Sequence, residues 1–142
     1  MFASGLGRFT PFVSSKGHYG SGSISGGGGG GGSITVDPPE INAPSVSGSN
    51  VTMNWAAPTH NSDNTTSPIV IDSYEIYYTL NADPTECKPG GAGVTAVTGI
   101  SSSATSQAIN SLASGTYWMS MRTIGGPGHT GGNLSDPITV TV

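Results

Sequence analysis

The stretch Ile71-Asp72-Ser73-Tyr74-Glu75-Ile76-Tyr77-Tyr78-Thr79 decides the fold class of this chain. Large apolar residues recur at every second position, which places Tyr74, Ile76 and Tyr78 on one face and Glu75 on the outer face. A period of two residues is typical of a strand with one buried side, and tyrosine and isoleucine favour strands. The stretch therefore predicts a half-buried β-strand, and nothing from residue 34 onward predicts a helix.

The same alternation recurs along residues 34–142. It is clear in Val51–Trp55, Thr116–Thr123 and Pro137–Val142, and weaker in Gly93–Ile100 and Ala104–Leu112. Clusters of Gly, Pro, Asn, Asp and Ser separate these runs at the spacing typical of a two-sheet sandwich rather than of strand-helix-strand units. The sequence thus predicts an all-β, two-sheet antiparallel sandwich, long enough to bury a core without disulfides or metal.

The inward positions of these strands predict the core. Its centre is expected to hold Trp55, Tyr74, Ile76, Leu112 and Tyr117. The other residues expected to face inward are Val46, Val51, Met53, Tyr78, Val97, Ile109, Met119, Met121, Ile138 and Val140.

The composition divides the chain near residue 33. Twelve of the 23 glycines lie in residues 1–33, seven of them in the unbroken run 26–32. The first 33 residues carry Arg8 and Lys16 and no acid, a formal +2, whereas residues 34–142 carry eight acids against Lys88 and Arg122, a formal −6. We therefore expect a Gly-rich extended arm over residues 1–33 and a folded domain over residues 34–142.

The arm has two interpretations. A run of glycines loses much backbone entropy on ordering and has no side chain to bury, which favours a flexible leader or linker. Apolar residues nevertheless recur along the arm, and all three phenylalanines of the protein lie in its first 12 residues. The preferred interpretation is an arm that orders on a partner through its apolar residues, namely Phe2, Leu6, Phe9, Phe12 and Tyr19.

Several classes of function are excluded by composition. Charged residues make up 8% of the chain against about 25% in an ordinary soluble domain, and its four scattered basic residues cannot form a nucleic-acid-binding patch. No apolar run approaches the length of a membrane span. No nucleophile motif, phosphate loop, cofactor motif or paired carboxylates point to an enzyme. Residues Met1–Arg8 lack the features of a cleavable signal peptide.

From about residue 36 to residue 142 the chain resembles the fibronectin type III domain. The residues that carry the resemblance are a proline-rich lead-in, a strand ending in Trp55, the Tyr74-x-Ile76-x-Tyr78 strand and Leu112-Ala-Ser-Gly-Thr-Tyr117 before another strand. The resemblance implies that Trp55 lies between the sheets and that Tyr117 forms a corner with Leu112. The family usually has one more residue between this leucine and tyrosine, which would select Trp118. Alternation with Met119 and Met121 favours Tyr117.

The loops of this predicted sandwich hold three potential metal ligands. His60 and Asp63 follow the Trp55 strand, and His129 precedes the last strand, so the fold would bring them to one end. The preferred interpretation is nonetheless solvated side chains and no metal site. Cys87, the single cysteine, is expected in a solvated loop over Asp83–Gly91, as an idle free thiol or paired with another chain.

Two functions remain open. Fibronectin type III-like domains occur on phage structural proteins and on bacterial surface proteins. The first hypothesis is a multi-copy, non-enzymatic structural or decoration subunit of an extracellular assembly, a tailed-phage virion, whose arm docks on a capsid or tail protein. The alternative is a bacterial surface or secreted module that binds a cell-surface glycan or protein through its loops.

Overall fold

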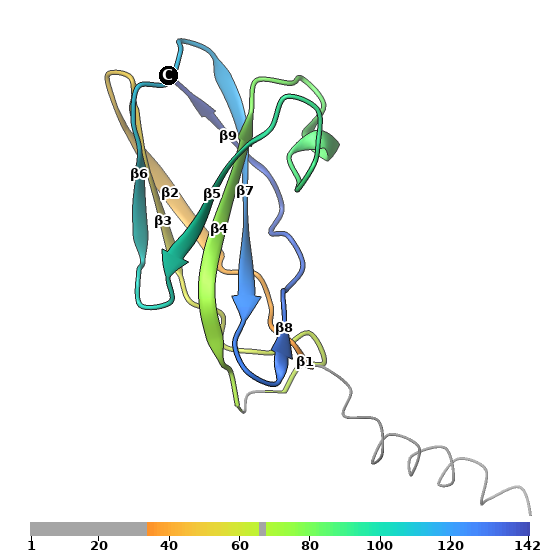
Figure 1. The fold of residues 1–142 in the computed structure, drawn as a ribbon. Helices are drawn as coiled ribbons and strands as arrows, with labels where there is room; N and C mark the ends of the chain where they lie inside the picture. Colours follow the sequence, from red (N-terminus) through yellow and green to blue (C-terminus); the bar gives the residue numbers. More distant parts are fainter. Residues whose placement is uncertain (1–33, 66–67) are drawn as a thin grey trace, which may run out of the picture. The chain divides into compact units, whose positions relative to one another are not determined.

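The computed structural model describes residues 34–65 and 68–142. These residues form two packed antiparallel sheets (Figure 1), so the predicted all-β sandwich is confirmed. Because the arm lies outside the described residues, its expected partner-binding side chains do too, namely Phe2, Leu6, Phe9, Phe12 and Tyr19.

The first sheet has three strands in the order β2-β3-β6, whose bounds are Glu40–Ser47, Asn50–Ala56 and Ser106–Ile109. In the central strand the residues at every second position are buried, because this face packs on the other sheet. The register places Val51 opposite Ile109, and both residues belong to the core.

The second sheet has four strands in the order β5-β4-β7-β9, with bounds Thr95–Ser101, Ile71–Thr79, Thr116–Gly125 and Ile138–Thr141. All three pairs of neighbouring strands are antiparallel. This sheet includes the Tyr74-x-Ile76-x-Tyr78 stretch in β4, and its register sets Ile76 opposite Met121.

A short pair of strands closes one end of the sandwich. β1 (Ile34–Thr35) pairs in parallel with β8 (His129–Thr130). In Figure 1 this pair lies at the opposite end of the domain from the C-terminus. The described chain therefore enters the sandwich at one end and finishes at the other.

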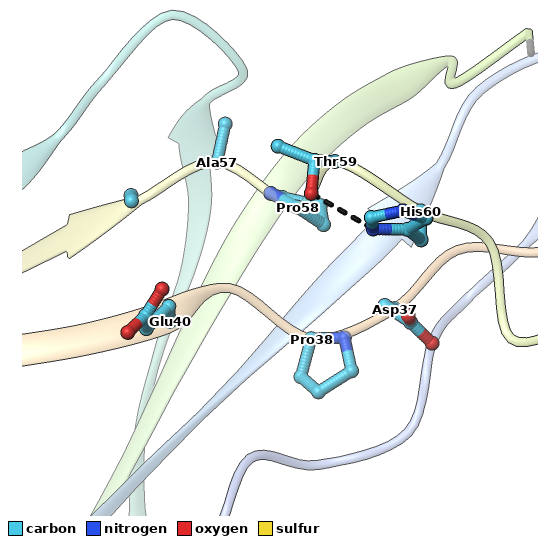
Figure 2. Close-up of a pocket in the computed structure, with 8 residues that line it drawn as sticks. Asp37, Pro38, Glu40, Ala57, Pro58, Thr59 and His60 are labelled. Atoms are coloured by element: carbon cyan, nitrogen blue, oxygen red, sulfur yellow. Dashed lines mark hydrogen bonds between the residues drawn. The ribbon is translucent and has the colours of Figure 1, made fainter. Parts of the chain in front are cut away.

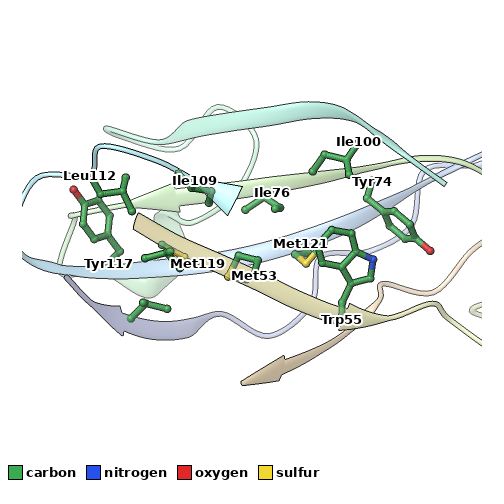
Figure 3. Close-up of a cluster of buried hydrophobic side chains, with 12 residues drawn as sticks. Met53, Trp55, Tyr74, Ile76, Ile100, Ile109, Leu112, Tyr117, Met119 and Met121 are labelled. Carbon is green, nitrogen blue, oxygen red and sulfur yellow. The ribbon is translucent and has the colours of Figure 1, made fainter. Parts of the chain in front are cut away.

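The core fills the space between the sheets. Trp55 and Tyr74 lie towards one end of it and Leu112 and Tyr117 towards the other, with Ile76 between them (Figure 3). The rings of Trp55 and Tyr74 meet edge to face with centroids 5.4 Å apart, an arrangement that aromatic pairs prefer. The other members of the cluster are Val51, Met53, Ile100, Ile109, Met119, Met121 and Val140.

The corner before β7 is made by Tyr117. Its side chain is buried and its hydroxyl donates a hydrogen bond to the Ala113 carbonyl oxygen over 3.0 Å. The indole of Trp118 lies on the other face of β7, where its Nε1 donates to the Ala82 carbonyl over 3.3 Å. Alternation along β7 therefore places Tyr117, and not Trp118, on the core side.

Val46 corrects one expectation about the core. An extra residue between Asn42 and Ser45 bulges β2, and the shifted register then sets Val46 opposite Val51 on the core-facing side. The side chain is nevertheless 45% exposed and outside the core cluster, because β2 is the edge strand of its sheet. A side chain on the core-facing side of an edge strand therefore stays exposed where no further strand covers it.

The expectation of a solvated loop around Cys87 is wrong for Cys87 itself. The segment from Leu80 to Val94 turns through the 3-10 helix η1 (Pro84–Glu86) and packs on the outer face of the four-stranded sheet. Cys87 is 3% exposed, and its Sγ lies 3.3 Å from the carbonyl oxygens of both Tyr77 and Trp118. Asp83, Thr85 and Lys88 of this segment are exposed, so the sequence pattern around Cys87 resembles a solvated loop.

Candidate binding surface

The end of the sandwich where β1 enters carries the two loops in which the sequence predicts recognition. Here the chain at Val36 bridges to Asn61 of the β3–β4 loop, and the Ser62 amide donates to the Thr35 carbonyl over 2.8 Å. On the other side the hydroxyls of Thr35 and Thr130 lie 3.0 Å apart. The entering strand is therefore held between the β3–β4 loop and β8, and it joins the two loops.

Asn61 organises the β3–β4 loop from inside. Its side chain is fully buried, and its Nδ2 donates to the Pro68 carbonyl and to the Thr65 hydroxyl, each over 3.2 Å. Its backbone amide donates to the Thr65 carbonyl and its carbonyl accepts from Asn64. A buried amide that bonds across a loop stabilises one loop conformation, because breaking these bonds would leave polar groups unpaired.

His129 connects the two loops. Its Nε2 lies 2.8 Å from the Pro68 carbonyl oxygen, and a carbonyl only accepts, so Nε2 is the donor. The same carbonyl accepts from Asn61, so one oxygen receives hydrogen bonds from both loops.

Glycine allows the close approach of these segments. A Cβ on Gly132 would clash with the Val36 carbonyl oxygen, and one on Gly125 would clash with the backbone of Thr130. The glycine-rich sequence between β7 and β9 therefore has a packing role at this end of the domain.

A shallow hollow of about 200 Å³ lies beside the entering strand. Figure 2 shows Asp37 and Glu40 on one side of it and Thr59 with His60 on the other, with a 2.9 Å hydrogen bond between the Thr59 hydroxyl and His60 Nδ1. The lining is acidic and hydroxyl-bearing, and it contains no aromatic ring other than the His60 imidazole and no Lys or Arg. Such a surface can exchange hydrogen bonds with a partner but offers no broad platform for stacking.

The three potential metal ligands do not form a metal-binding group. His60 bonds to Thr59 and His129 bonds to Pro68, while Asp63 Oδ1 accepts from the amide and the hydroxyl of Thr65. These hydrogen bonds from Thr65 hold the pKa of the Asp63 carboxyl below its usual value. Among the described residues, no set of three His, Cys, Asp or Glu side chains is placed to hold an ion.

A second polar cluster lies on the outer face of the four-stranded sheet. Arg122 donates to Glu75 Oε2 from Nη2 over 2.6 Å and from Nε over 3.1 Å, and the Tyr77 hydroxyl bonds to the same oxygen. Burial, reinforced by Glu75, raises the pKa of Tyr77 to about 12. Sequence alternation places Glu75 and Arg122 on this face, but the pairing of the three groups depends on strand register.

The two loops at the β1 end of the sandwich lack the residue types that dominate protein interfaces. The loops over residues 57–65 and 126–133 contain no Phe, Trp, Tyr, Lys or Arg. The large hydrophobic side chains exposed among the described residues are Val46 and Leu80, which are both aliphatic. None of the described helices is long and apolar enough to cross a membrane.

Solved structures resemble this sandwich, whereas comparison with protein-family models and with curated proteins produced no match. The class that the fold defines is the fibronectin type III-like β-sandwich. The third fibronectin III domain of the human KIAA0343 protein is similar, with a TM-score of 0.56 and 16% identity over 80% of this chain and 86% of that domain. A fourth fibronectin III domain from human has a TM-score of 0.51 and 12% identity over 78% of this chain and 79% of that one.

A bacterial enzyme contains a similar region. A β-1,2-glucanase from Parabacteroides distasonis matches with a TM-score of 0.53 and 11% identity over 77% of this chain. This chain spans only 13% of that glucanase. At these identities the likeness to all three structures is one of fold alone.

Proposed function

We propose that this chain is a non-enzymatic structural subunit of an extracellular assembly, a tailed-phage virion. In this proposal the arm over residues 1–33 docks on a capsid or tail protein, and the sandwich over residues 34–142 is the displayed domain. The observation that carries the proposal is the distribution of aromatic residues. The sandwich keeps its aromatic rings buried or half-buried, whereas the arm holds Phe2, Phe9, Phe12 and Tyr19.

Protein interfaces draw most of their binding energy from a few aromatic and arginine side chains. The arm has both kinds, because Arg8 directly precedes Phe9. The loops have neither. The division of residue types therefore supports the arm as the element that binds and the sandwich as the element that is carried.

The anchored entry of the chain supports the same proposal. Val36 is fully buried and bridges to Asn61, so the tether ends at a fixed point on the domain. In this proposal the glycines at 26–32 are the spacer between the partner and that point. A domain attached in this way stays on the particle without a large interface of its own.

The test uses an arm variant, the full chain with Phe2→Ser, Phe9→Ser and Phe12→Ser. Virions are produced from genomes encoding either the wild type or the arm variant, and copies of the chain per particle are counted by quantitative mass spectrometry. We expect the arm variant to melt at the wild-type temperature but to be lost from particles. A matched control, Val46→Ser with Leu80→Ser, removes exposed apolar groups from the sandwich and should leave the copy number unchanged. A wild-type copy number in arm-variant particles contradicts the proposal, and so does the absence of the chain from particles made with the wild-type genome.

The alternative is a bacterial surface or secreted module that binds through its loops. The observation in its favour is the rigid loop end, where the Pro68 carbonyl holds both loops through Asn61 and His129. Under this alternative the ligand is a cell-surface glycan or protein that exchanges hydrogen bonds with the polar side chains beside the loops. Under this alternative, the arm variant binds cells as well as the wild type does, and a loop variant such as Thr59→Ala with Asn64→Ala loses binding.

A further inference from the structure

The four-stranded sheet has one edge strand without a charged residue. The strand order β5-β4-β7-β9 pairs β5 (Thr95–Ser101) with β4 on one side, and no described residue pairs with its other side (Figure 1). Five of the seven residues of β5 are exposed. The strand lies within residues 89–121, a stretch of 33 residues that has no Asp, Glu, Lys, Arg or His. An open strand of this composition is a template for pairing with another chain.

The other three edge strands of the two sheets have features that oppose such pairing. β2 begins with the exposed Glu40, contains Pro44 and is bulged. β6 and β9 are only four residues long, and Asp136 and Pro137 directly precede β9. Proteins protect their sheet edges with charge, proline, bulges and short strands. Among the described residues, β5 is therefore the one long edge strand that has neither a charge nor a proline.

A bulge divides β5 into two parts. The register to β4 shifts between Val97 and Ile100, and Gly99 has a φ of +69° there. Before the bulge, residues 95–97 pair in unbroken register with residues 76–78. A bulge bends a strand and interrupts its ladder, so it protects the end of β5 that contains Gly99. The straight part of β5, residues 95–97, remains available for pairing.

The charged groups nearest to β5 do not oppose contact at its straight part. Glu75 of β4 forms an ion pair with Arg122, with 2.6 Å between Oε2 and Nη2, so its charge is balanced within the sheet. Asp72 lies towards the other end of β4, beyond the bulge. Glu86 lies before the strand begins, where its Oε2 accepts from the Ala92 amide.

The net charge of the domain favours this edge for contact between copies. Residues 34–142 are formally −6, and like charge opposes contact wherever the acidic side chains of two copies meet. An edge strand without charge avoids this repulsion. It also has no charge that would select an oppositely charged partner, which favours an identical strand.

We propose that β5 is the site at which two copies of this chain pair. The straight parts of the two strands form an antiparallel ladder about a two-fold axis, so the same surface serves both copies. The two four-stranded sheets then become one continuous sheet.

The inference goes beyond the proposed function, because it concerns contact between displayed domains and not attachment to a particle. Main-chain hydrogen bonds over a few residues supply the affinity, so the association is weak. Copies displayed side by side on a particle are at high local concentration, where a weak contact is populated.

The experiment measures the mass of the full-length chain in solution by sedimentation equilibrium, from about 10 μM to about 1 mM. We expect the weight-average mass of the wild type to rise with concentration from 14.2 kDa towards twice that value. The arm variant should associate equally, because its sandwich is unchanged. A wild type that keeps the monomer mass at every concentration overturns the inference, and so does association that is lost in the arm variant.

Charges introduced on the strand test the pairing site. Ala96 is exposed in the middle of the straight part, so Ala96→Asp and Ala96→Lys each place like charges on both strands of the pair. Each variant alone should associate about tenfold more weakly than the wild type. An equimolar mixture of the two should regain the wild-type association, because opposite charges then face each other.

Ser45→Asp and Ser45→Lys are the matched controls. Ser45 is exposed on β2, an edge strand of the other sheet, and its variants make the same changes in net charge. They should associate like the wild type. The inference is wrong if the Ser45 variants weaken association as much as the Ala96 variants do, or if the mixture of Ala96 variants stays as weak as its components.

Amide chemical shifts of the ¹⁵N-labelled wild type provide a measurement without substitution, which stands even where an Ala96 variant fails to fold. The shifts of residues 95–97 should move with concentration, whereas those of Ser45 and Ser47 in β2 should not. Concentration-dependent shifts that leave residues 95–97 unchanged overturn the inference. None of these results affects the proposed function, which is measured by incorporation into particles.

Discussion

The hydroxyl of Tyr117 donates a hydrogen bond to the carbonyl oxygen of Ala113 over 3.0 Å, four residues back along the chain. This bond ties the loop before β7 to the strand itself, at the end of the core where Leu112 is buried. It also marks the side of β7 that faces the core.

Removing this hydroxyl should destabilise the domain without disturbing its packing. Tyr117→Phe keeps the ring and loses the bond, so we expect the free energy of unfolding to fall by about 0.5–1.5 kcal/mol. Urea denaturation followed by tryptophan fluorescence measures it. Tyr78→Phe is the matched control, because its ring packs against Tyr117 with centroids 6.0 Å apart, and it should change stability less. Equal losses for the two variants would show that the corner bond has no special role.

The two tryptophans should differ in their contributions to stability. Trp55 is 2% exposed between the sheets, so Trp55→Ala should destabilise the domain by about 3–5 kcal/mol, a large share of the stability of a small domain. Trp118→Phe removes mainly the hydrogen bond from Nε1 to Ala82 and should cost about 0.5–1.5 kcal/mol. Thermal and urea unfolding of both variants measure the two losses of stability. A larger loss in Trp118→Phe than in Trp55→Ala would contradict the placement of Trp55 in the core.

Alkaline pH should destabilise the native state through Tyr77. Its pKa is about 12 in the folded chain and about 10 in an unfolded one, so between these values the unfolded state loses its proton first. The contribution of Tyr77 is therefore complete below pH 10 and declines as the pH rises towards 12. Urea midpoints at several pH values should show a decline that is shallower in Tyr77→Phe.

The Cys87 thiol acts in the same direction, because burial raises its pKa as well. The effect of Tyr77→Phe is therefore measured in a Cys87→Ala background. If the urea midpoint falls equally steeply with pH in chains with and without the Tyr77 hydroxyl, then Tyr77 does not contribute to the pH dependence of stability.

The Asn61 side chain should hold the β3–β4 loop in one conformation. Asn61→Ala removes the bonds to Thr65 and Pro68 and should cost about 1–3 kcal/mol. Hydrogen exchange should accelerate at the Ser62 and Asn64 amides, which lie in the same loop. Asn110→Ala, at an exposed position after β6, is the control and should have little effect. Unchanged exchange in Asn61→Ala would indicate that the loop is held by its backbone alone.

The thiol of Cys87 should react slowly in the native chain. The side chain is 3% exposed beneath the segment that follows β4, and burial raises its pKa, so little thiolate is available at neutral pH. We expect labelling by a disulfide reagent to be on the order of a hundredfold slower than in urea, equivalent to an opening free energy of about 3 kcal/mol. A Cys87→Ala chain with Ser102→Cys, at an exposed position, should react at the unfolded rate. Fast labelling of native Cys87 would mean that the covering segment opens freely.

Alternation along the chain was sufficient to predict the strands and most of the core. In β4 and β7 the core side chains lie two positions apart, and this period is a property of consecutive residues that the sequence displays directly. The same rule selects Tyr117 over Trp118 at the corner, where counting from the family pattern alone would have chosen the other residue.

Only the tertiary structure determines the surroundings of Cys87, Asn61 and Val46. The sequence around Cys87 reads as a solvated turn, yet the segment folds back on the sheet and buries the thiol. Asn61 is one asparagine among many, and only the meeting of two loops with the entering strand makes it a buried connection. Val46 has the alternation of a core residue, but the strand order leaves it at an uncovered edge. These outcomes depend on contacts between segments far apart in the chain, whereas the period of a strand is determined by neighbouring residues.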